Sequence, residues 1–343
     1  MNITSHSRID GPFLLYLGDK TNPLDVKTSR GMALFRPADC LGELRDDACP
    51  LSLGLPRMTA AEAVQAGAKA LVLGVATSGG RLEEVMVIRA LEALEAGLDI
   101  VSGLHQKLDS DQRLVVKARE LGRKLIDVRA APADLVVGKG TPRAGKRLLT
   151  VGTDCAVGKM FSSLHLVSAM QAEGLPARFR ATGQTGVLIA GEGVVIDSVI
   201  ADFISGAAEA LSPAREDQGW DVIEGQGSLF NPSFAGVSLG LLHGAQPQAL
   251  LLCHDPSRPH MRGLPHMPVP DLAACLEENL RCARLTSPNV EAVGVSLNTS
   301  QMTRDEAGAL CRQIEGELGL PCVDPAIDGM APIVARIRQR FGS

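Results

Sequence analysis

The 343-residue sequence predicts an α/β protein with two domains. Continuous apolar runs such as Lys69–Val75, which are too uniform for half-exposed strands, indicate strands buried in a parallel sheet. Segments whose apolar residues recur at helical spacing, such as Leu82–Ala96, alternate with these runs. The stretch Pro132–Lys146 is rich in Gly, Pro and Lys, which is typical of a link between domains. We therefore expect one domain over residues 1–140 and a second over residues 141–343.

In residues 1–140 the predicted strands and helices alternate along the chain. The first strand is Phe13–Leu17, and the later elements are helix 60–66, strand 69–75, helix 82–96, strand 98–101, helix 110–122 and strand 124–128. Gly97 is expected to end the second helix, because glycine adopts the left-handed conformation readily. Successive βαβ units predict a Rossmann-like doubly wound domain. Ligands of such sheets bind at the carboxyl ends of strands, where Ser78–Gly80 and His105 fall.

In residues 141–343 the first predicted strand, Leu148–Val151, leads into a glycine-bounded loop and then into a helix over 161–173. Thr303 and Glu306 have the spacing of a capping box at a helix start, and Gly319 is expected to end that helix. The other predicted strands are 177–180, 220–223, 249–253, 290–297 and 322–325, and the other predicted helices are 196–210, 271–284 and 331–341. This alternation again predicts a mainly parallel sheet.

The loop after Leu148–Val151 has the pattern of a phosphate-binding loop. In such a loop, backbone N–H groups and the N-terminus of the next helix surround a phosphate, and Lys159 adds a positive charge. The position between a strand and a helix favours this interpretation over a tight turn with a surface lysine. We expect a P-loop NTPase-like α/β domain with nine candidate cofactor contacts: Gly152, Thr153, Asp154, Cys155, Ala156, Val157, Gly158, Lys159 and Met160.

Two features of this loop differ from the usual GxxxxGK[ST] pattern. Five residues rather than four separate Gly152 from Gly158, and Met160 occupies the position of the usual Ser or Thr. A thioether is a poor ligand for Mg²⁺, which prefers hard oxygen ligands. We therefore expect the loop to hold phosphates without a metal ion, for a ligand whose phosphates serve for binding and do not react. Coenzyme A is such a ligand.

Polar residues follow three further predicted strands of the second domain. Glu224 lies at the end of one of them. It could act as a general base, or it could belong to a hydrogen-bonded turn. The loop after 249–253 carries two arginines that could bind carboxylates or phosphates, although a solvated surface loop is the alternative. Candidate catalytic residues are Glu224, Asp255 and His254, and candidate substrate contacts are Gln184, Thr185, Arg258 and Arg262.

Four stretches, GTDCAVGK, ATGQTG, EGQGSL and CHDPSRP, occur in this order behind the Rossmann-like half. Together they resemble the DgcN family, and GTDCAVGK alone resembles the P-loop of dethiobiotin synthetase-type proteins, which also carry the extra residue. The resemblance covers nearly the whole chain. It implies a D-glutamate N-acetyltransferase that uses acetyl-CoA as cosubstrate and lies outside the GNAT fold. A general base would accept the proton of the substrate ammonium, and the amine would attack the thioester directly.

Other classes of protein remain open at this point. One is an ATP-dependent ligase or kinase of the dethiobiotin synthetase type, against which Met160 counts. Another is a nucleotide-binding regulatory protein without chemistry. A dinucleotide oxidoreductase is disfavoured, because no GxGxxG follows the first predicted strand.

The bulk properties narrow the range of partners. A net charge of −5 argues against nucleic-acid binding, and the sequence has no run long enough to span a membrane. No export signal is visible, and the eight cysteines include no CxxC pair, so we expect reduced thiols in a cytoplasmic protein. We expect a small-molecule amino-acid substrate, no required metal, and a homo-oligomer.

Overall fold

The computed structural model describes residues 9–342, which form two compact units. Residues 9–131 and the segment Val187–Val195 form the N-terminal unit. Pro132–Gly186 and residues 196–342 form the P-loop unit. A short segment of the second half of the chain therefore belongs to the first unit. The domain boundary expected at residue 140 stays a prediction.

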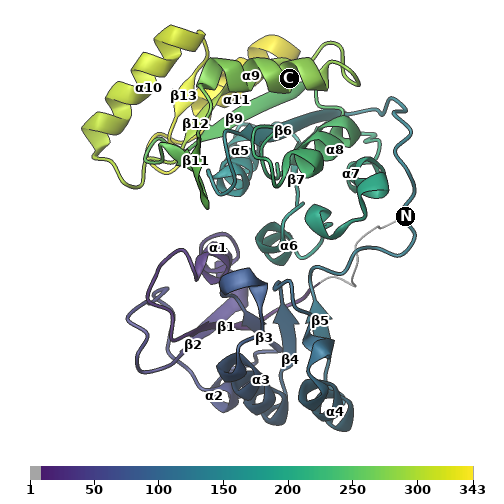
Figure 1. Ribbon diagram of the computed structural model, residues 1–343, viewed down its shortest axis with the longest axis vertical. Coiled ribbons are helices and arrows are strands. Elements are labelled where there is room, and N and C mark those ends of the chain that lie inside the picture. Colours follow the sequence, from purple (N-terminus) through teal and green to yellow (C-terminus); the bar gives the residue numbers. More distant parts are fainter. Residues whose placement is uncertain (1–8, 343) are drawn as a thin grey trace. The chain divides into compact units, whose positions relative to one another are not determined.

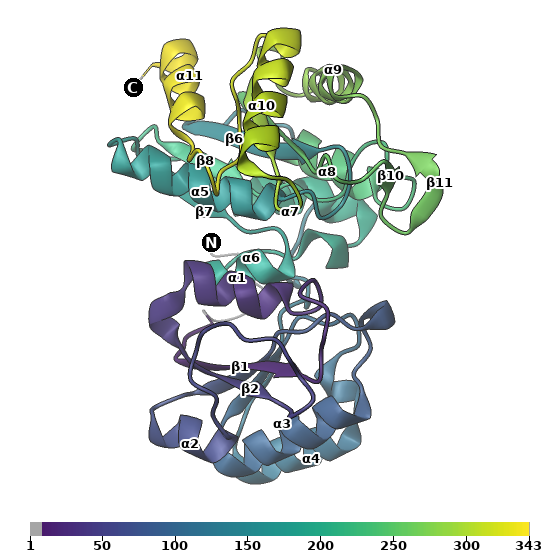
Figure 2. The same ribbon diagram turned by 90° about the vertical axis from the view of Figure 1, so that its left-hand side faces the viewer.

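The N-terminal unit contains a five-stranded parallel sheet in the order β2-β1-β3-β4-β5 (Figure 1). Helices α2, α3 and α4 lie on one face of this sheet and α1 on the other (Figure 2). The expected Rossmann-like doubly wound architecture is confirmed, since this strand order is a common doubly wound order. The strands are β1 (Phe13–Gly18), β2 (Cys40–Arg45), β3 (Ala70–Leu73), β4 (Asp99–Ser102) and β5 (Leu125–Asp127), and the helices are α1 (Lys27–Phe35), α2 (Ala60–Gln65), α3 (Glu84–Ala96) and α4 (Gln112–Leu121).

The P-loop unit contains a six-stranded parallel sheet in the order β13-β12-β9-β6-β8-β7. Its strands are β6 (Lys146–Gly152), β7 (Ala177–Arg180), β8 (Trp220–Ile223), β9 (Ala249–His254), β12 (Glu291–Leu297) and β13 (Cys322–Val323). A separate two-stranded hairpin consists of β10 (His260–Met261) and β11 (Leu264–Pro268). Its helices are α5 (Lys159–Ala172), α7 (Ile204–Leu211), α8 (Ala235–Ala245), α9 (Leu272–Ala283), α10 (Arg304–Leu318) and α11 (Ala331–Phe341). Helix α6 (Gln184–Ala190) begins in this unit and ends in the segment Val187–Val195, which belongs to the N-terminal unit.

Helices cover both faces of the six-stranded sheet. On one face α5 and α11 pack against the strands, and on the other lie α8 and α9 (Figure 2). The core beneath α5 and α11 is aliphatic and includes Leu148, Leu166, Met170, Val222, Leu251, Ile333 and Ile337. Trp220 also belongs to this core, and the close packing of its apolar side chains supports the strands at whose ends the polar loops lie.

Several expected elements differ from the structure. The segment 181–186 is not wholly a loop, because α6 begins at Gln184. The single helix expected over 196–210 is two 3₁₀ turns, Ile196–Ser198 and Ala201–Phe203, followed by α7. The loop after β9 contains the hairpin β10–β11, and α1, β2 and α8 had no counterpart in the sequence prediction.

Helix α8 was not predicted from the sequence, because a segment rich in glycine is typical of a loop. Glycine lowers helix propensity by about 1 kcal/mol, so AGVSLGLLHGA does not read as a helix. Tertiary packing explains these glycines. A Cβ at Gly240 would lie 2.7 Å from Ile204 Cγ2, and one at Gly244 would lie 2.1 Å from the carbonyl oxygen of Ser205. The glycines therefore allow α7 and α8 to approach each other closely.

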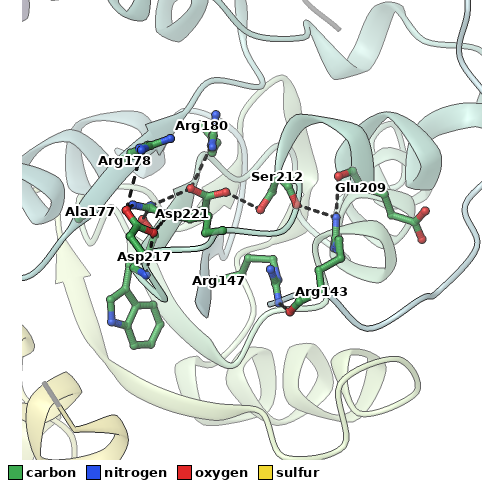
Figure 3. Close-up of polar contacts among 12 residues, drawn as sticks. Arg143, Arg147, Ala177, Arg178, Arg180, Glu209, Ser212, Asp217 and Asp221 are labelled. Carbon is green, nitrogen blue, oxygen red and sulfur yellow. Dashed lines mark hydrogen bonds and ion pairs between the residues drawn. The ribbon is translucent and has the colours of Figure 1, made fainter. Parts of the chain in front are cut away.

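A network of charged residues lies at the amino ends of β6 and β8 (Figure 3). The Asp221 carboxylate is buried, with its Oδ1 atom 3.0 Å from Arg180 Nε and 3.1 Å from Arg215 Nη1. Ser212 Oγ donates a hydrogen bond of 2.7 Å to Asp221 Oδ2. Arg215 also pairs with Asp217, whose side chain is 41% exposed. One buried carboxylate thus balances two guanidinium groups.

The predicted link is fixed to the P-loop unit by Arg143 (Figure 3). Its Nη1 atom donates to the carbonyl oxygens of Glu209 and Ser212 at the end of α7, at 2.7 and 2.9 Å. Its Nη2 atom donates to the carbonyl oxygen of Gly244 at the end of α8, at 2.6 Å. The last carbonyls of a helix carry partial negative charge, so a cation there is favourable.

Candidate active site

The phosphate-loop candidate follows β6, which lies between β9 and β8 in the six-stranded sheet. From β6 the chain continues to β7 and β8 on one side of the sheet and then crosses to β9 on the other. Strand β6 is therefore at the topological switch point, where ligands of such sheets bind. Because the strands are parallel, the loops after β7, β8 and β9 leave the sheet at the same edge.

The loop backbone has the strained geometry of a phosphate cradle. Ala156 and Gly158 have φ angles of 55° and 101°, in the left-handed region that non-glycine residues rarely adopt. A Cβ at Gly152 would lie 2.7 Å from Val157 Cγ2 and 3.2 Å from Lys159 Nζ. Glycine at this position therefore lets the loop fold tightly around the lysine.

Lys159 is the first residue of α5 and is only 6% exposed. The alternative prediction, a tight turn with a surface lysine, is therefore wrong. Its Nζ atom donates to the carbonyl oxygens of Asp154 and Gly227, at 2.7 and 2.8 Å. Burial lowers the pKa of this ammonium group, against the opposing effect of nearby acidic groups. The lysine thus places a desolvated cation at the centre of the loop.

The Asp154 carboxylate, in the same loop, is fully buried. Its Oδ1 atom accepts a hydrogen bond of 2.8 Å from Asn231 Nδ2, in the loop after β8. Its Oδ2 atom accepts from the backbone N–H of Arg262 at 2.7 Å and from Arg258 Nη1 at 3.2 Å, both after β9. Asn231 could not be identified as a site residue from the sequence, because only the fold brings it next to Asp154.

His254 ends β9 beside the phosphate loop. Its Nδ1 atom lies 2.9 Å from Thr153 Oγ1. Burial lowers the pKa of His254, while the neighbouring Asp255 carboxylate opposes this effect. The imidazole is therefore neutral near pH 7. In the tautomer in which Nδ1–H donates to Thr153, Nε2 carries the lone pair that can accept a proton.

Asp255 is surrounded by donors from its own loop. Its Oδ1 atom accepts from Ser257 N at 3.1 Å and Ser257 Oγ at 2.6 Å. Its Oδ2 atom lies 3.3 Å from Arg258 Nε and 3.4 Å from Asn298 Nδ2. Both oxygens of this carboxylate are therefore already in contact with donors of the protein. These contacts favour His254 over Asp255 as a base.

Glu224 follows β8 and is 5% exposed. Its Oε2 atom accepts hydrogen bonds of 3.0 Å from the backbone N–H groups of Thr182 and Gly183. Burial raises the pKa of Glu224, and these two hydrogen bonds oppose the shift. A Cβ at Gly186 would lie 2.3 Å from Glu224 Oε2, so the start of α6 packs directly on this carboxylate.

The remaining candidates lie in different surroundings. Arg262 is exposed, and within residues 9–342 its guanidinium makes no ion pair or hydrogen bond. Gln184 and Thr185 open α6, and Gln184 Oε1 is buried without a hydrogen-bond partner in the described part of the chain. His105 and Ser78–Gly80 lie together in the N-terminal unit, since a Cβ at Gly80 would lie 2.6 Å from His105 Cδ2.

Three further features of residues 9–342 bear on the chemistry. No group of three or more His, Cys, Asp and Glu side chains in this range is placed to hold a metal ion. None of the eight cysteines, all of which lie in this range, forms a disulfide bond. Within the same range, every helix is too short or too polar to cross a membrane.

The residues after β6, β8 and β9 thus lie close together. The loop after β6 contains a buried ammonium and a helix N-terminus, which are groups able to bind phosphate, and the imidazole of His254 contacts the same loop. This arrangement suits binding of a phosphate-bearing cosubstrate next to a group that accepts a proton.

Two family models match most of the chain. Residues 39–131 match the domain of unknown function DUF1611_N, described as a Rossmann-like domain. Residues 136–334 match the domain of unknown function DUF1611_C, described as a P-loop domain.

Two curated relatives match nearly the whole chain, and both are named D-glutamate N-acetyltransferase. The one from Pseudoalteromonas sp. is 49% identical over 330 residues, which cover 96% of this chain and 99% of the relative. The one from Tritonibacter scottomollicae is 45% identical over 326 residues, which cover 95% and 98%. The crystal structure of a DUF1611 family protein from Anabaena variabilis superposes with a TM-score of 0.87 at 32% identity, covering 96% of this chain and 99% of that one.

Proposed function

Because the chain belongs to the DUF1611 family, with its Rossmann-like and P-loop domains, we propose that it is a D-glutamate N-acetyltransferase. The observation that carries this proposal is the 49% identity to a D-glutamate N-acetyltransferase over 99% of that relative's length. Identity at this level along both units argues for a shared activity as well as a shared fold. The ATP-dependent ligase, the regulatory protein and the oxidoreductase are set aside on the same ground.

Acetyl-CoA is the proposed acetyl donor, and when bound it would supply an acyl thioester. The phosphate loop fits its phosphates in two respects. The Lys159 ammonium is buried, and its hydrogen-bond acceptors among residues 9–342 are two backbone carbonyl oxygens. The first backbone N–H groups of α5 lie at the same end of the loop. A desolvated cation bound only to neutral acceptors gains strongly when an anion arrives.

The chemistry proposed for the chain's own residues is proton transfer and orientation. An amine attacks a thioester only in its neutral form, so a base must take its proton. His254 is the first candidate, because its imidazole is neutral and is oriented by Thr153. Glu224 is the second, since burial raises its pKa toward neutrality. Asp255 is third, because four donors surround it.

The remaining residue assignments are proposals of the same kind. Gln184, Thr185, Arg258 and Arg262 remain the candidate contacts of the amino-acid substrate. The homo-oligomer and the cytoplasmic location stay predictions.

The proposed activity is tested by incubating the purified protein with acetyl-CoA and each enantiomer of glutamate. We expect release of free CoA thiol with D-glutamate and formation of N-acetyl-D-glutamate by mass spectrometry. L-glutamate serves as the stereochemical control. Absence of product with either enantiomer, in a folded protein that binds CoA, would contradict the proposed reaction.

The same assay in EDTA tests the proposal that no metal is required. We expect unchanged turnover, because Met160 supplies no hydroxyl and Ser162 and Ser163, further along α5, are buried. Ser162 Oγ donates to the carbonyl oxygen of Gly158 at 3.1 Å, and Ser163 Oγ donates to that of Lys159 at 2.9 Å. Loss of turnover in EDTA with recovery on adding Mg²⁺ would show that a divalent cation takes part.

The phosphate role of Lys159 is tested by calorimetry. Lys159→Ala is expected to weaken acetyl-CoA binding by about tenfold to hundredfold, the usual value of a charged hydrogen bond, with D-glutamate affinity little changed. Lys139→Ala, in the exposed part of the link, is the matched control and should bind acetyl-CoA normally. Equal acetyl-CoA affinity in both folded variants would remove Lys159 from the cofactor site.

A further inference from the structure

Asp154 lies inside the phosphate loop, yet its side chain is chemically unsuited to binding phosphate. An ionised carboxylate only accepts hydrogen bonds, so it cannot bind a phosphate and would repel one. Its two oxygens accept three hydrogen bonds from other parts of the chain. The donors belong to Asn231, Arg262 and Arg258. A fully buried charge needs such partners, because an unpaired one is very costly. The position of Asp154 is therefore set by the loops it joins.

The Arg258 guanidinium contacts three acceptor groups of the protein itself. Its Nη1 atom faces Asp154 at 3.2 Å, its Nη2 atom donates to the carbonyl oxygen of Cys155 at 3.0 Å, and its Nε atom lies 3.3 Å from Asp255. Two of these three acceptors belong to the phosphate loop. Arg258 thus connects that loop to the loop after β9. Its side chain is only 21% exposed and makes these protein contacts, so it is less available to a substrate carboxylate than the side chain of Arg262.

Arg262 has the opposite arrangement. Its backbone N–H is held by Asp154 at 2.7 Å, whereas its side chain is exposed and unpaired within residues 9–342. The hairpin turn at Gly263, with a φ angle of 75°, follows immediately. Asp154 therefore fixes the backbone of a residue whose guanidinium is exposed to solvent. A free guanidinium can bind a carboxylate through two parallel hydrogen bonds.

We infer that Asp154 is a positioning residue that holds Arg262 in place through its backbone, that Arg258 completes this connection, and that Arg262 binds the side-chain carboxylate of the amino-acid substrate. This inference rests on the proposed function and divides the roles of two arginines that the sequence left equivalent. It also separates two functions of the phosphate loop. The backbone and Lys159 serve the cosubstrate, whereas the Asp154 side chain serves the substrate loop.

The substrate role is tested first with Arg262→Gln, which changes only an exposed side chain. We expect KM for D-glutamate to rise by about tenfold to hundredfold, the usual effect of losing a charged contact, with KM for acetyl-CoA unchanged. D-norvaline, whose side chain has no carboxylate, should be used equally by the wild type and the variant. An unchanged KM for D-glutamate would overturn the role of Arg262.

The positioning role is tested with Asp154→Asn and with the double variant Asp154→Asn, Arg262→Gln. Asp154→Asn should raise KM for D-glutamate, and the double variant should be no worse than Arg262→Gln alone, since both changes remove the same contact. Asp324→Asn is the matched control. Asp324 is another buried strand-end carboxylate that accepts from backbone N–H groups, those of Thr299 and Ala326, and its variant should keep a normal KM.

Calorimetry with CoA and with D-glutamate gives a readout that does not depend on turnover. Asp154→Asn should bind CoA as the wild type does and bind D-glutamate more weakly. Additive effects in the double variant, or a loss confined to CoA, would overturn the positioning role. A wild-type protein that binds both ligands as expected but forms no product would instead contradict the proposed reaction alone.

Discussion

Replacing His254 with asparagine is expected to lower kcat for acetyl transfer by about 10²–10⁴-fold, the usual contribution of a general base. The asparagine amide can occupy the place of Nδ1, which lies 2.9 Å from Thr153 Oγ1, but it offers no basic nitrogen. Binding of acetyl-CoA should change little, because the phosphate loop is untouched. The loss should become smaller as pH rises, when more of the substrate amine is already neutral.

The pH profile of the wild type gives an independent measurement. Burial lowers the pKa of His254, so the basic form persists below the ordinary histidine value of about 6.5. The acid limb of kcat/KM is therefore expected below pH ~6.5, as His254 becomes protonated.

Two other variants make the test of His254 specific. His266→Asn changes an exposed histidine on β11 and should leave kcat and the profile unchanged. Glu224→Gln removes the alternative base and keeps an oxygen that can accept from Thr182 and Gly183. If Glu224→Gln loses activity while His254→Asn retains it, the carboxylate is the base and His254 is not.

Replacing Asp221 with asparagine is expected to destabilise the P-loop unit by about 3–5 kcal/mol, because breaking a buried ion pair leaves an uncompensated buried charge. Arg180 lies 3.0 Å from this carboxylate (Figure 3). Arg215 lies 3.1 Å from it, and an amide cannot balance the two guanidinium groups. Asp217 partly compensates Arg215, so Arg180 is the residue left without a counter-charge.

The chain contains a probe for this measurement. Trp220 is the single tryptophan, is 1% exposed and precedes Asp221, so its fluorescence reports unfolding of this unit during a urea titration. Asp217→Asn is the matched control, because the Asp217 side chain is 41% exposed and pairs with the same arginine. A similar loss of stability in the two variants would show that the buried position of Asp221 does not matter.

The sequence predicted the regular parts of the fold because local patterns determine them. Strands 177–180 and 220–223 agree with β7 and β8 at both ends, and α11 agrees with the helix expected over 331–341. The capping box of Thr303 and Glu306 is present, and Gly319 ends α10 in the left-handed conformation as expected. Such signals lie within a few residues of one another, so they can be read without the fold.

Features that depend on tertiary contacts could not be predicted from local sequence patterns. The glycines of α8 suit close packing on α7 and have no local helical signal. In the site, the strand ends that carry Glu224 and His254 could be placed, because parallel strands end at one edge. The difference between Arg258 and Arg262 could not be predicted, since it depends on which of them meets Asp154 through its side chain and which through its backbone.

The segment Val187–Val195 has a consequence for dividing the chain into fragments. It belongs to the N-terminal unit although it is encoded within the P-loop half. Its Leu188 is buried, with a carbonyl oxygen that accepts from Arg36 Nη1 at 2.9 Å, and Gly191 accepts from the backbone of Ile9 at 3.0 Å. A recombinant fragment that stops before residue 187 would lack these partners, and one that starts at residue 132 would carry an apolar segment that belongs elsewhere. A single cut therefore cannot yield two complete units, because the N-terminal unit consists of two separate stretches of the chain.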